Sequence, residues 1–262
     1  MDQFSGISDF NIDRPPPAMK QSCIILSLVL FAIAMIGDKP AVFGKEVSFQ
    51  SGSHRIKGYL ATPNGTGPFP TVLFLHGGMG PIVGGNPSAV VDALANAGFV
   101  GFAPIRRNNP SMATHAHDTV AAIDFLKRLN QVDNARLAIT GFSRGGLLAF
   151  MASTRRQDLQ AVVLMAPAHG RGILHRFLTD AGNVSAPTLI LVARNDTRQA
   201  NHVSLSRQIH TGLRAAGKQT ELIVCPPYGQ DGHHLFFEVR LSYWQDVERF
   251  LKTQLNSGSE DR

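Results

Sequence analysis

The chain has 262 residues, 44% of them hydrophobic and 17% charged, which suits one globular α/β domain with a sizeable buried core. Lys and Arg number 25 against 19 Asp and Glu, a formal net charge of +6, but the basic residues are scattered and no run of five like charges occurs. Because the chain also lacks zinc-finger spacing and interleaved basic and aromatic residues, its composition argues against nucleic-acid binding.

The N-terminal segment is typical of an export signal. After Met19 and Lys20, an apolar run of fourteen residues spans positions 23–36, shorter than the ~20 residues of a membrane span, and Ala32 and Ala34 offer a cleavage site. We expect an exported protein, with residues 1–37 as extension and signal peptide and residues 38–262 as a single domain. A buried hydrophobic helix and an uncleaved membrane anchor are the alternatives. Residues 1–18 are acidic and proline-rich, which favours Met19 as the translation start.

From residue 46 onward, short apolar runs alternate with helix-like stretches, the pattern of a mostly parallel sheet flanked by helices. A hairpin is expected first, and buried strands and helices follow it. The expected hairpin strands are 46–49 and 56–61, the other strands are 71–75, 99–103, 137–140, 161–166, 188–193 and 222–224, and apolar residues recur at helical spacing over 120–129 and 239–250. This predicts an α/β-hydrolase fold with about eight strands. The short segment between residues 168 and 188 leaves no room for a large lid domain.

The strongest chemical signal is the G-x-S-x-G pentapeptide at residues 141–145. It directly follows the expected strand 137–140 and precedes an apolar, helix-compatible stretch. A sharp strand-to-helix turn exposes a nucleophilic serine, and glycines are needed beside it because a Cβ would clash with neighbouring backbone. We therefore predict Ser143 as the nucleophile and the backbone N–H of Arg144 as one oxyanion donor.

A glycine-rich loop, His76-Gly77-Gly78, follows the expected strand 71–75. Small residues let the backbone approach a substrate, so we assign the second oxyanion donor to the N–H of Gly78, with Gly77 as the alternative. His76 is expected to brace this loop.

A serine needs a base, and the base needs a partner that fixes its tautomer. Asp196 follows the expected strand 188–193, and His233 follows the strand 222–224, which gives the chain order Ser, Asp, His at the carboxyl ends of strands. His234 is the alternative base. Asp231 is the rival acid, but it lies only two residues from His233 and is expected to be a turn residue.

Other polar residues carry weaker signals. Arg106 and Arg107 follow the strand 99–103 and are candidates to bind a substrate carboxylate, although solvated loop arginines are more common. Cys23 and Cys225 supply neither a disulfide framework nor a zinc site, and no H-E-x-x-H pattern occurs. We expect no metal and no cofactor, and a small-molecule ester is the predicted partner.

Several segments together resemble the dienelactone hydrolase-like branch of the α/β-hydrolases, over about residues 45–255. They are His76-Gly77-Gly78, residues 121–126, 141–146, 195–197 and 232–236, and the downstream Trp244 and Phe250. The resemblance implies cofactor-free hydrolysis of an ester or lactone through an acyl-enzyme, carried by Ser143, Asp196 and His233. The namesake enzymes use a cysteine nucleophile where this chain has Ser143, which weakens the inference to dienelactone as the substrate.

Two other functions are compatible with the same residues. A peptidase related to the prolyl-oligopeptidase catalytic domain would use the same triad, but no propeller or other gating domain is present in the sequence. A non-catalytic, exported binding module could retain the fold. Since all three catalytic positions are filled, hydrolysis is the favoured function.

Overall fold

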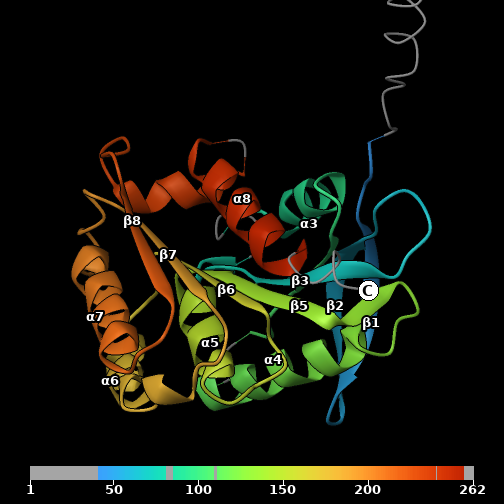
Figure 1. Ribbon diagram of the computed structural model, residues 1–262, viewed down its shortest axis with the longest axis horizontal. Helices are drawn as coiled ribbons and strands as arrows, with labels where there is room; N and C mark the ends of the chain where they lie inside the picture. Colours follow the sequence, from blue (N-terminus) through green and yellow to red (C-terminus); the bar gives the residue numbers. More distant parts are fainter. Residues whose placement is uncertain (1–40, 81–84, 109–110, 240, 257–262) are drawn as a thin grey trace, which may run out of the picture. The chain divides into compact units, whose positions relative to one another are not determined.

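The computed structural model of the chain describes residues 41–80, 85–108, 111–239 and 241–256 (Figure 1). From Ala41 onward the chain forms one compact unit. The expected signal segment and Cys23 lie outside the described residues. None of the helices in the described part combines the length and the apolar character that crossing a membrane requires.

An eight-stranded sheet forms the centre of this described unit, in the order β1-β2-β4-β3-β5-β6-β7-β8 (Figure 1). β1 and β2 form the expected antiparallel hairpin, β2 also pairs antiparallel with β4, and the remaining neighbours are parallel. The strands are β1 (Lys45–Ser51), β2 (His54–Ala61), β3 (Phe69–Leu75), β4 (Val100–Pro104), β5 (Val132–Phe142), β6 (Ala161–Met165), β7 (Thr188–Ala193) and β8 (Thr220–Cys225). The fold class expected from the sequence is confirmed.

Helices cover both faces of the sheet and divide the core into two apolar layers. α3 and α8 pack on one face, while α4, α5, α6 and α7 pack on the other (Figure 1). The helices are α3 (Pro87–Asn96), α4 (Met112–Leu126), α5 (Arg144–Ser153), α6 (Ile173–Leu178), α7 (His202–Ala215) and α8 (Tyr243–Asn256), with short 3-10 helices η1 (Gly170–Gly172), η2 (Ala181–Asn183) and η3 (Gly232–Phe237). Burial of both faces explains why the parallel strands are continuous apolar runs.

Two expected boundaries are wrong for identifiable reasons. β5 begins at Val132, five residues before the expected start. The sequence did not indicate this first part of the strand, because it is partly exposed and lacks an apolar pattern. The last helix begins at Tyr243 and not at Val239, and its buried stripe runs through Val247 and Leu251 while Phe250 is only partly buried. Tyr243 and Val247 lie on the buried face as the spacing suggested, whereas Phe250 lies at its border.

The topology gathers loops at one edge of the sheet. β3, β4, β5, β6, β7 and β8 are parallel, so the residues that follow them emerge at the same carboxyl edge, where α/β folds place their ligands. Between β6 and β7 the chain holds only η1, α6 and η2, and no lid domain is present in the described residues.

Candidate active site

Ser143 sits on the strained turn between β5 and α5. Its backbone has φ 53° and ψ −114°, a conformation that costs a non-glycine residue on the order of 1–3 kcal/mol and persists only where surrounding contacts enforce it. Those contacts are backbone hydrogen bonds: the Ser143 N–H donates to the carbonyl of Met165 over 2.8 Å, and the Ser143 carbonyl accepts from Leu147 and Ala168, each over 3.0 Å. The half-buried serine is therefore held by β6 and by its own helix.

The flanking glycines are required by close backbone approach. A Cβ on Gly141 would overlap the carbonyl of Gly145, and a Cβ on Gly145 would overlap the carbonyl of Leu75 at the end of β3. These overlaps involve backbone, which cannot move aside as a flexible side chain can. The pentapeptide thus packs the start of α5 directly against β3.

A buried histidine–aspartate pair lies on the next two loops. His233 Nδ1 donates to Asp196 Oδ2 over 2.8 Å, and both side chains are at most 4% exposed. The ring of Phe142 packs on the His233 imidazole with centroids 4.6 Å apart. Since Phe142 directly precedes Ser143, this contact places the imidazole beside the serine turn.

The alternative residues have other roles in the structure. Asp231 accepts a hydrogen bond from the backbone N–H of His233 over 3.1 Å, the turn role expected for it. His234 is exposed and its ring packs against Phe237 at 4.8 Å. Only His233 of the two histidines has the carboxylate partner that a base needs.

The loop after β3 lies against the serine turn. The position of a Cβ on Gly78 would be 3.8 Å from the Arg144 side chain, so the two expected oxyanion donors come from adjacent backbone segments.

His76 is 2% exposed; its Nδ1 donates to the Gly77 carbonyl over 3.0 Å, and its Nε2 accepts from the backbone N–H of Arg106 over 3.1 Å. Burial, aided by the Arg106 charge, lowers the pKa of His76 to about 3. His76 is thus a neutral brace for the loop.

Arg106 and Arg107, the two candidate substrate-binding residues, both contact other parts of the protein. The Arg106 guanidinium donates to the carbonyls of His76 and Gly77, so it supports the oxyanion loop. Burial, with the nearby charge of Arg144, lowers its pKa to about 10. Arg107 forms a two-point ion pair with Asp118 over 2.9 and 2.8 Å. Both guanidinium groups have protein partners, which disfavours the substrate contact for which their position made them candidates.

A second histidine, His202, completes the buried cluster and was not singled out by the sequence. Its ring lies 4.4 Å from the His233 ring, and its Nε2 is 4.0 Å from Asp196 Oδ1. Asp196, His202 and His233 offer three ligand atoms within 4.8 Å of one another, a donor set that suits zinc. The His233 Nδ1–H already donates to Asp196, however, so a metal there would displace the proton that orients the base.

Cysteine chemistry has no support in the described residues. Cys225 is buried at the end of β8 and is 7% exposed. Burial raises the pKa of its thiol to about 11, which disfavours the nucleophilic thiolate.

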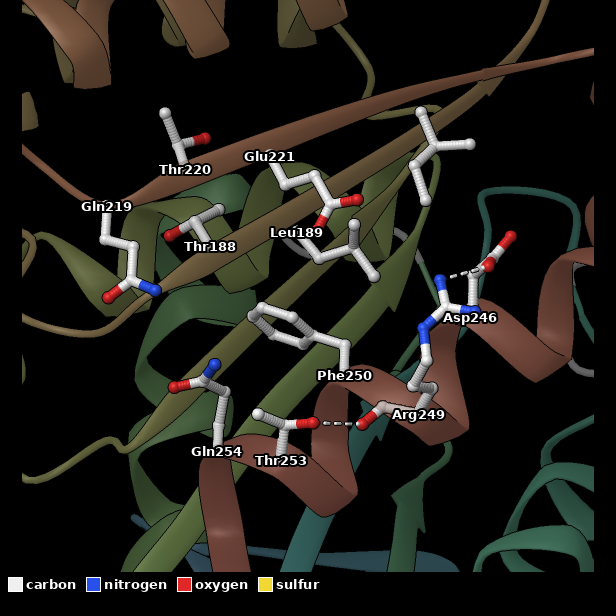
Figure 2. Close-up of a pocket in the computed structure, with 11 residues that line it drawn as sticks. Thr188, Leu189, Gln219, Thr220, Glu221, Asp246, Arg249, Phe250, Thr253 and Gln254 are labelled. Atoms are coloured by element: carbon white, nitrogen blue, oxygen red, sulfur yellow. Dashed lines mark hydrogen bonds and ion pairs between the residues drawn. The ribbon is translucent and has the colours of Figure 1, made fainter. Parts of the chain in front are cut away.

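Two cavities differ in their relation to this site. One of about 620 Å³ opens beside the serine turn and is lined by Arg144, Leu147, Ala168, His169, Gly170, Arg171, Ile173, Arg176 and Met112. The other, of about 260 Å³, lies between β8 and α8, where Asp246 pairs with Arg249 and Phe250 covers the strands (Figure 2). Neither lining includes a triad residue, but Arg144 of the first cavity follows Ser143 in the chain and Ala168 donates a hydrogen bond to the Ser143 carbonyl. Of these two cavities, the first is therefore the candidate to receive a substrate.

Taken together, the sheet, the strained serine turn and the buried histidine–aspartate pair define a hydrolase of the α/β-hydrolase class. Comparison with known proteins gives the family. The model of the dienelactone hydrolase family matches residues 105–243, and the chain belongs to that family. It is a carboxylic ester hydrolase that acts on esters or lactones.

Individual relatives are distant. The chain is 28% identical to the "Putative carboxymethylenebutenolidase" of Methylorubrum extorquens over 233 residues, 79% of this chain and 77% of that protein. The solved structure of a "Putative Dienelactone Hydrolase" from Klebsiella pneumoniae shares the fold with a TM-score of 0.63 and 19% identity, over 80% of this chain and 98% of the other. Pyrococcus horikoshii acylaminoacyl peptidase matches at TM-score 0.65 and 18% identity, over 85% of this chain but 43% of the longer peptidase.

Proposed function

We propose that Ser143, His233 and Asp196 form the catalytic triad of this hydrolase. The observation that carries the assignment is the strained backbone of Ser143 at the β5–α5 turn, beside the buried His233–Asp196 hydrogen bond. In this proposal Ser143 Oγ attacks the carbonyl carbon while His233 Nε2 takes its proton. Asp196 holds the Nδ1–H tautomer and stabilises the imidazolium.

The attack gives a tetrahedral intermediate, which collapses to an acyl-enzyme that water then hydrolyses. The backbone N–H groups of Arg144 and Gly78 stabilise the oxyanion, and the N-terminal end of α5 adds a favourable dipole. His233 Nε2 returns the proton to the leaving alcohol as the bond to that oxygen breaks, which leaves an acyl group on Ser143. Water, activated by His233, hydrolyses this acyl-enzyme and restores the serine.

Charge stabilisation by backbone donors predicts that hydrolysis needs no metal. Purified protein should cleave short-chain aryl esters without added metal, and EDTA should leave the rate unchanged. The control is the same assay after dialysis against zinc-free buffer. Activity that is lost with EDTA and restored by zinc would show that the Asp196–His202–His233 cluster works as a metal site.

The large cavity favours substrates that carry negative charge. The side chains of Arg144, Arg171 and Arg176 line it, and no acidic residue does. None of the three guanidinium groups forms an ion pair within the described residues. Guanidinium groups pair well with carboxylates. The name of the Methylorubrum extorquens relative, carboxymethylenebutenolidase, also denotes an enzyme that acts on a lactone with a carboxylate. We therefore infer that an ester or lactone with a carboxylate is preferred.

Removing two of these charges should weaken binding without altering chemistry. We expect Arg171→Ala combined with Arg176→Ala to raise KM for a carboxylate-bearing aryl ester by about 10-fold, with kcat within about twofold, because each exposed ion pair is worth up to ~1 kcal/mol. KM for a neutral aryl ester should not change. Arg207→Ala, which removes an exposed charge on α7, is the matched control. An equal rise in KM for both esters would rule out charge recognition.

A peptidase remains the second candidate, because longer peptidases share the fold. Parallel assays with aryl esters and with aminoacyl anilides separate the two functions. Turnover of anilides at rates comparable to esters would favour the peptidase.

We also propose that the protein is exported, on the apolar run at residues 23–36. Expression of the full gene in a bacterium should give a mature N-terminus between about Ala34 and Ala41, as read by N-terminal sequencing. Protein that still begins at Met1 or Met19 in the cytoplasm would refute cleavage.

A further inference from the structure

His202 contacts two members of the proposed triad, Asp196 and His233. It is the first residue of α7 and is 3% exposed. Its backbone N–H donates to the carbonyl of Asp196 over 3.1 Å, and its ring packs on the ring of His233 with centroids 4.4 Å apart and planes 32° apart. The acid and the base are therefore both in contact with this one residue.

The orientation of the His202 ring is fixed from the nucleophile's side. Its Nδ1 lies 3.2 Å from the carbonyl oxygen of Pro167, and because a carbonyl only accepts, Nδ1 carries the proton. Pro167 belongs to the short segment after β6 whose neighbours, Met165 and Ala168, hydrogen-bond the backbone of Ser143. A shift of the serine turn is thereby coupled to the position of the His202 ring.

The charge state of His202 also suits the reaction. Burial lowers the pKa of His202, which favours the neutral form of its ring. During proton transfer His233 becomes an imidazolium, which a neutral aromatic ring at this distance favours. A cationic His202 would repel that imidazolium and would compete for Asp196, whose Oδ1 lies 4.0 Å away and has no hydrogen-bond partner in the described residues.

We propose that His202 is a positioning residue of the hydrolysis, whose ring holds the His233 imidazole in the orientation that accepts the serine proton. This role rests on the proposed triad and goes beyond it, because His202 acts through the His233 imidazole and not as the nucleophile, base or acid. The rings of His202 and Phe142 both pack on the His233 imidazole, with centroids 4.4 and 4.6 Å away, and together they restrict its orientation. Misplacement of a catalytic group by about 1 Å can cost about 100-fold in rate.

Two substitutions separate ring packing from hydrogen bonding. His202→Phe keeps a ring against His233 but loses the donor to Pro167, whereas His202→Asn keeps an amide N–H near the Nδ1 position but loses the ring. We expect His202→Asn to lower kcat by about 10- to 100-fold with KM within about twofold, and His202→Phe to retain kcat within about fivefold of the wild type. His210→Asn, a partly buried histidine on the same helix that contacts Thr220, is the matched control and should behave as wild type.

Thermal unfolding of each variant shows whether a loss of rate is a loss of fold. If His202→Asn does not fold, His202→Leu, which keeps apolar bulk without a ring, takes its place. The proposal fails if kcat stays within twofold in the ring-less variant, or if the Phe variant loses as much as the ring-less one. It also fails if KM rises as much as kcat falls. Wild-type protein that neither hydrolyses esters nor reacts at Ser143 would instead contradict the proposed function itself.

Discussion

Replacing either Ser143 or His233 by alanine should lower kcat for an aryl ester by on the order of 10³-fold or more, because the nucleophile and the base act as one unit. The Ser143 backbone is held by the carbonyl of Met165 and by its own helix, so the alanine variant should keep the wild-type fold. Steady-state kinetics on each variant, with thermal unfolding as a check on folding, measure the effect.

The double variant gives the sharper test. Ser143→Ala with His233→Ala should be scarcely slower than either single variant, since a base without a nucleophile has nothing to activate. Losses that multiply would mean that the two side chains act independently. A substitution at the adjacent, exposed His234 is the natural control, and His234→Ala should leave kcat close to that of the wild type. If His234→Ala abolishes turnover and His233→Ala does not, our choice of base is wrong.

Asp196→Asn should lower kcat by on the order of 10²- to 10⁴-fold while KM changes little. The carboxylate accepts the His233 Nδ1–H over 2.8 Å in a site with almost no solvent exposure. An amide in its place presents either a donor, which forces the wrong imidazole tautomer, or a neutral oxygen, which cannot stabilise the imidazolium. Asp231→Asn is the matched control, because the side chain of Asp231 accepts a hydrogen bond from the backbone N–H of His233 and makes no contact with the His233 ring nitrogens in the described residues. Equal losses at both positions would overturn the assignment of Asp196.

The sequence predicted the fold well because its signals were local. Continuous apolar runs indicated the buried parallel strands. The pentapeptide at 141–145 predicted the β5–α5 turn, because close backbone contacts there require its glycines. The chain order of Asp196 and His233 was enough to place both on neighbouring loops. These features depend on residues close in sequence or on the right-handed crossover between parallel strands, which most such sheets obey.

Features that depend on the meeting of distant segments could not be predicted. Arg106 reaches back thirty residues to the loop carbonyl of His76, which its position after β4 did not indicate. His202 follows Asp196 by six residues at the start of an ordinary amphipathic helix, and its contact with His233 exists only once β7 and β8 pair. Arg171 has a positive φ of 53° between two glycines, a local sign of an unusual loop but not of a cationic cavity.

The central claim, that Ser143 is the nucleophile, is tested most directly by covalent labelling. A fluorophosphonate reacts with an activated serine and leaves a stable adduct that peptide mass spectrometry locates. We expect one probe per chain, on the peptide that contains Ser143, with labelling abolished in Ser143→Ala and strongly slowed in His233→Ala. Folded, active enzyme that takes up no probe, or that takes it up on another residue, would contradict the account.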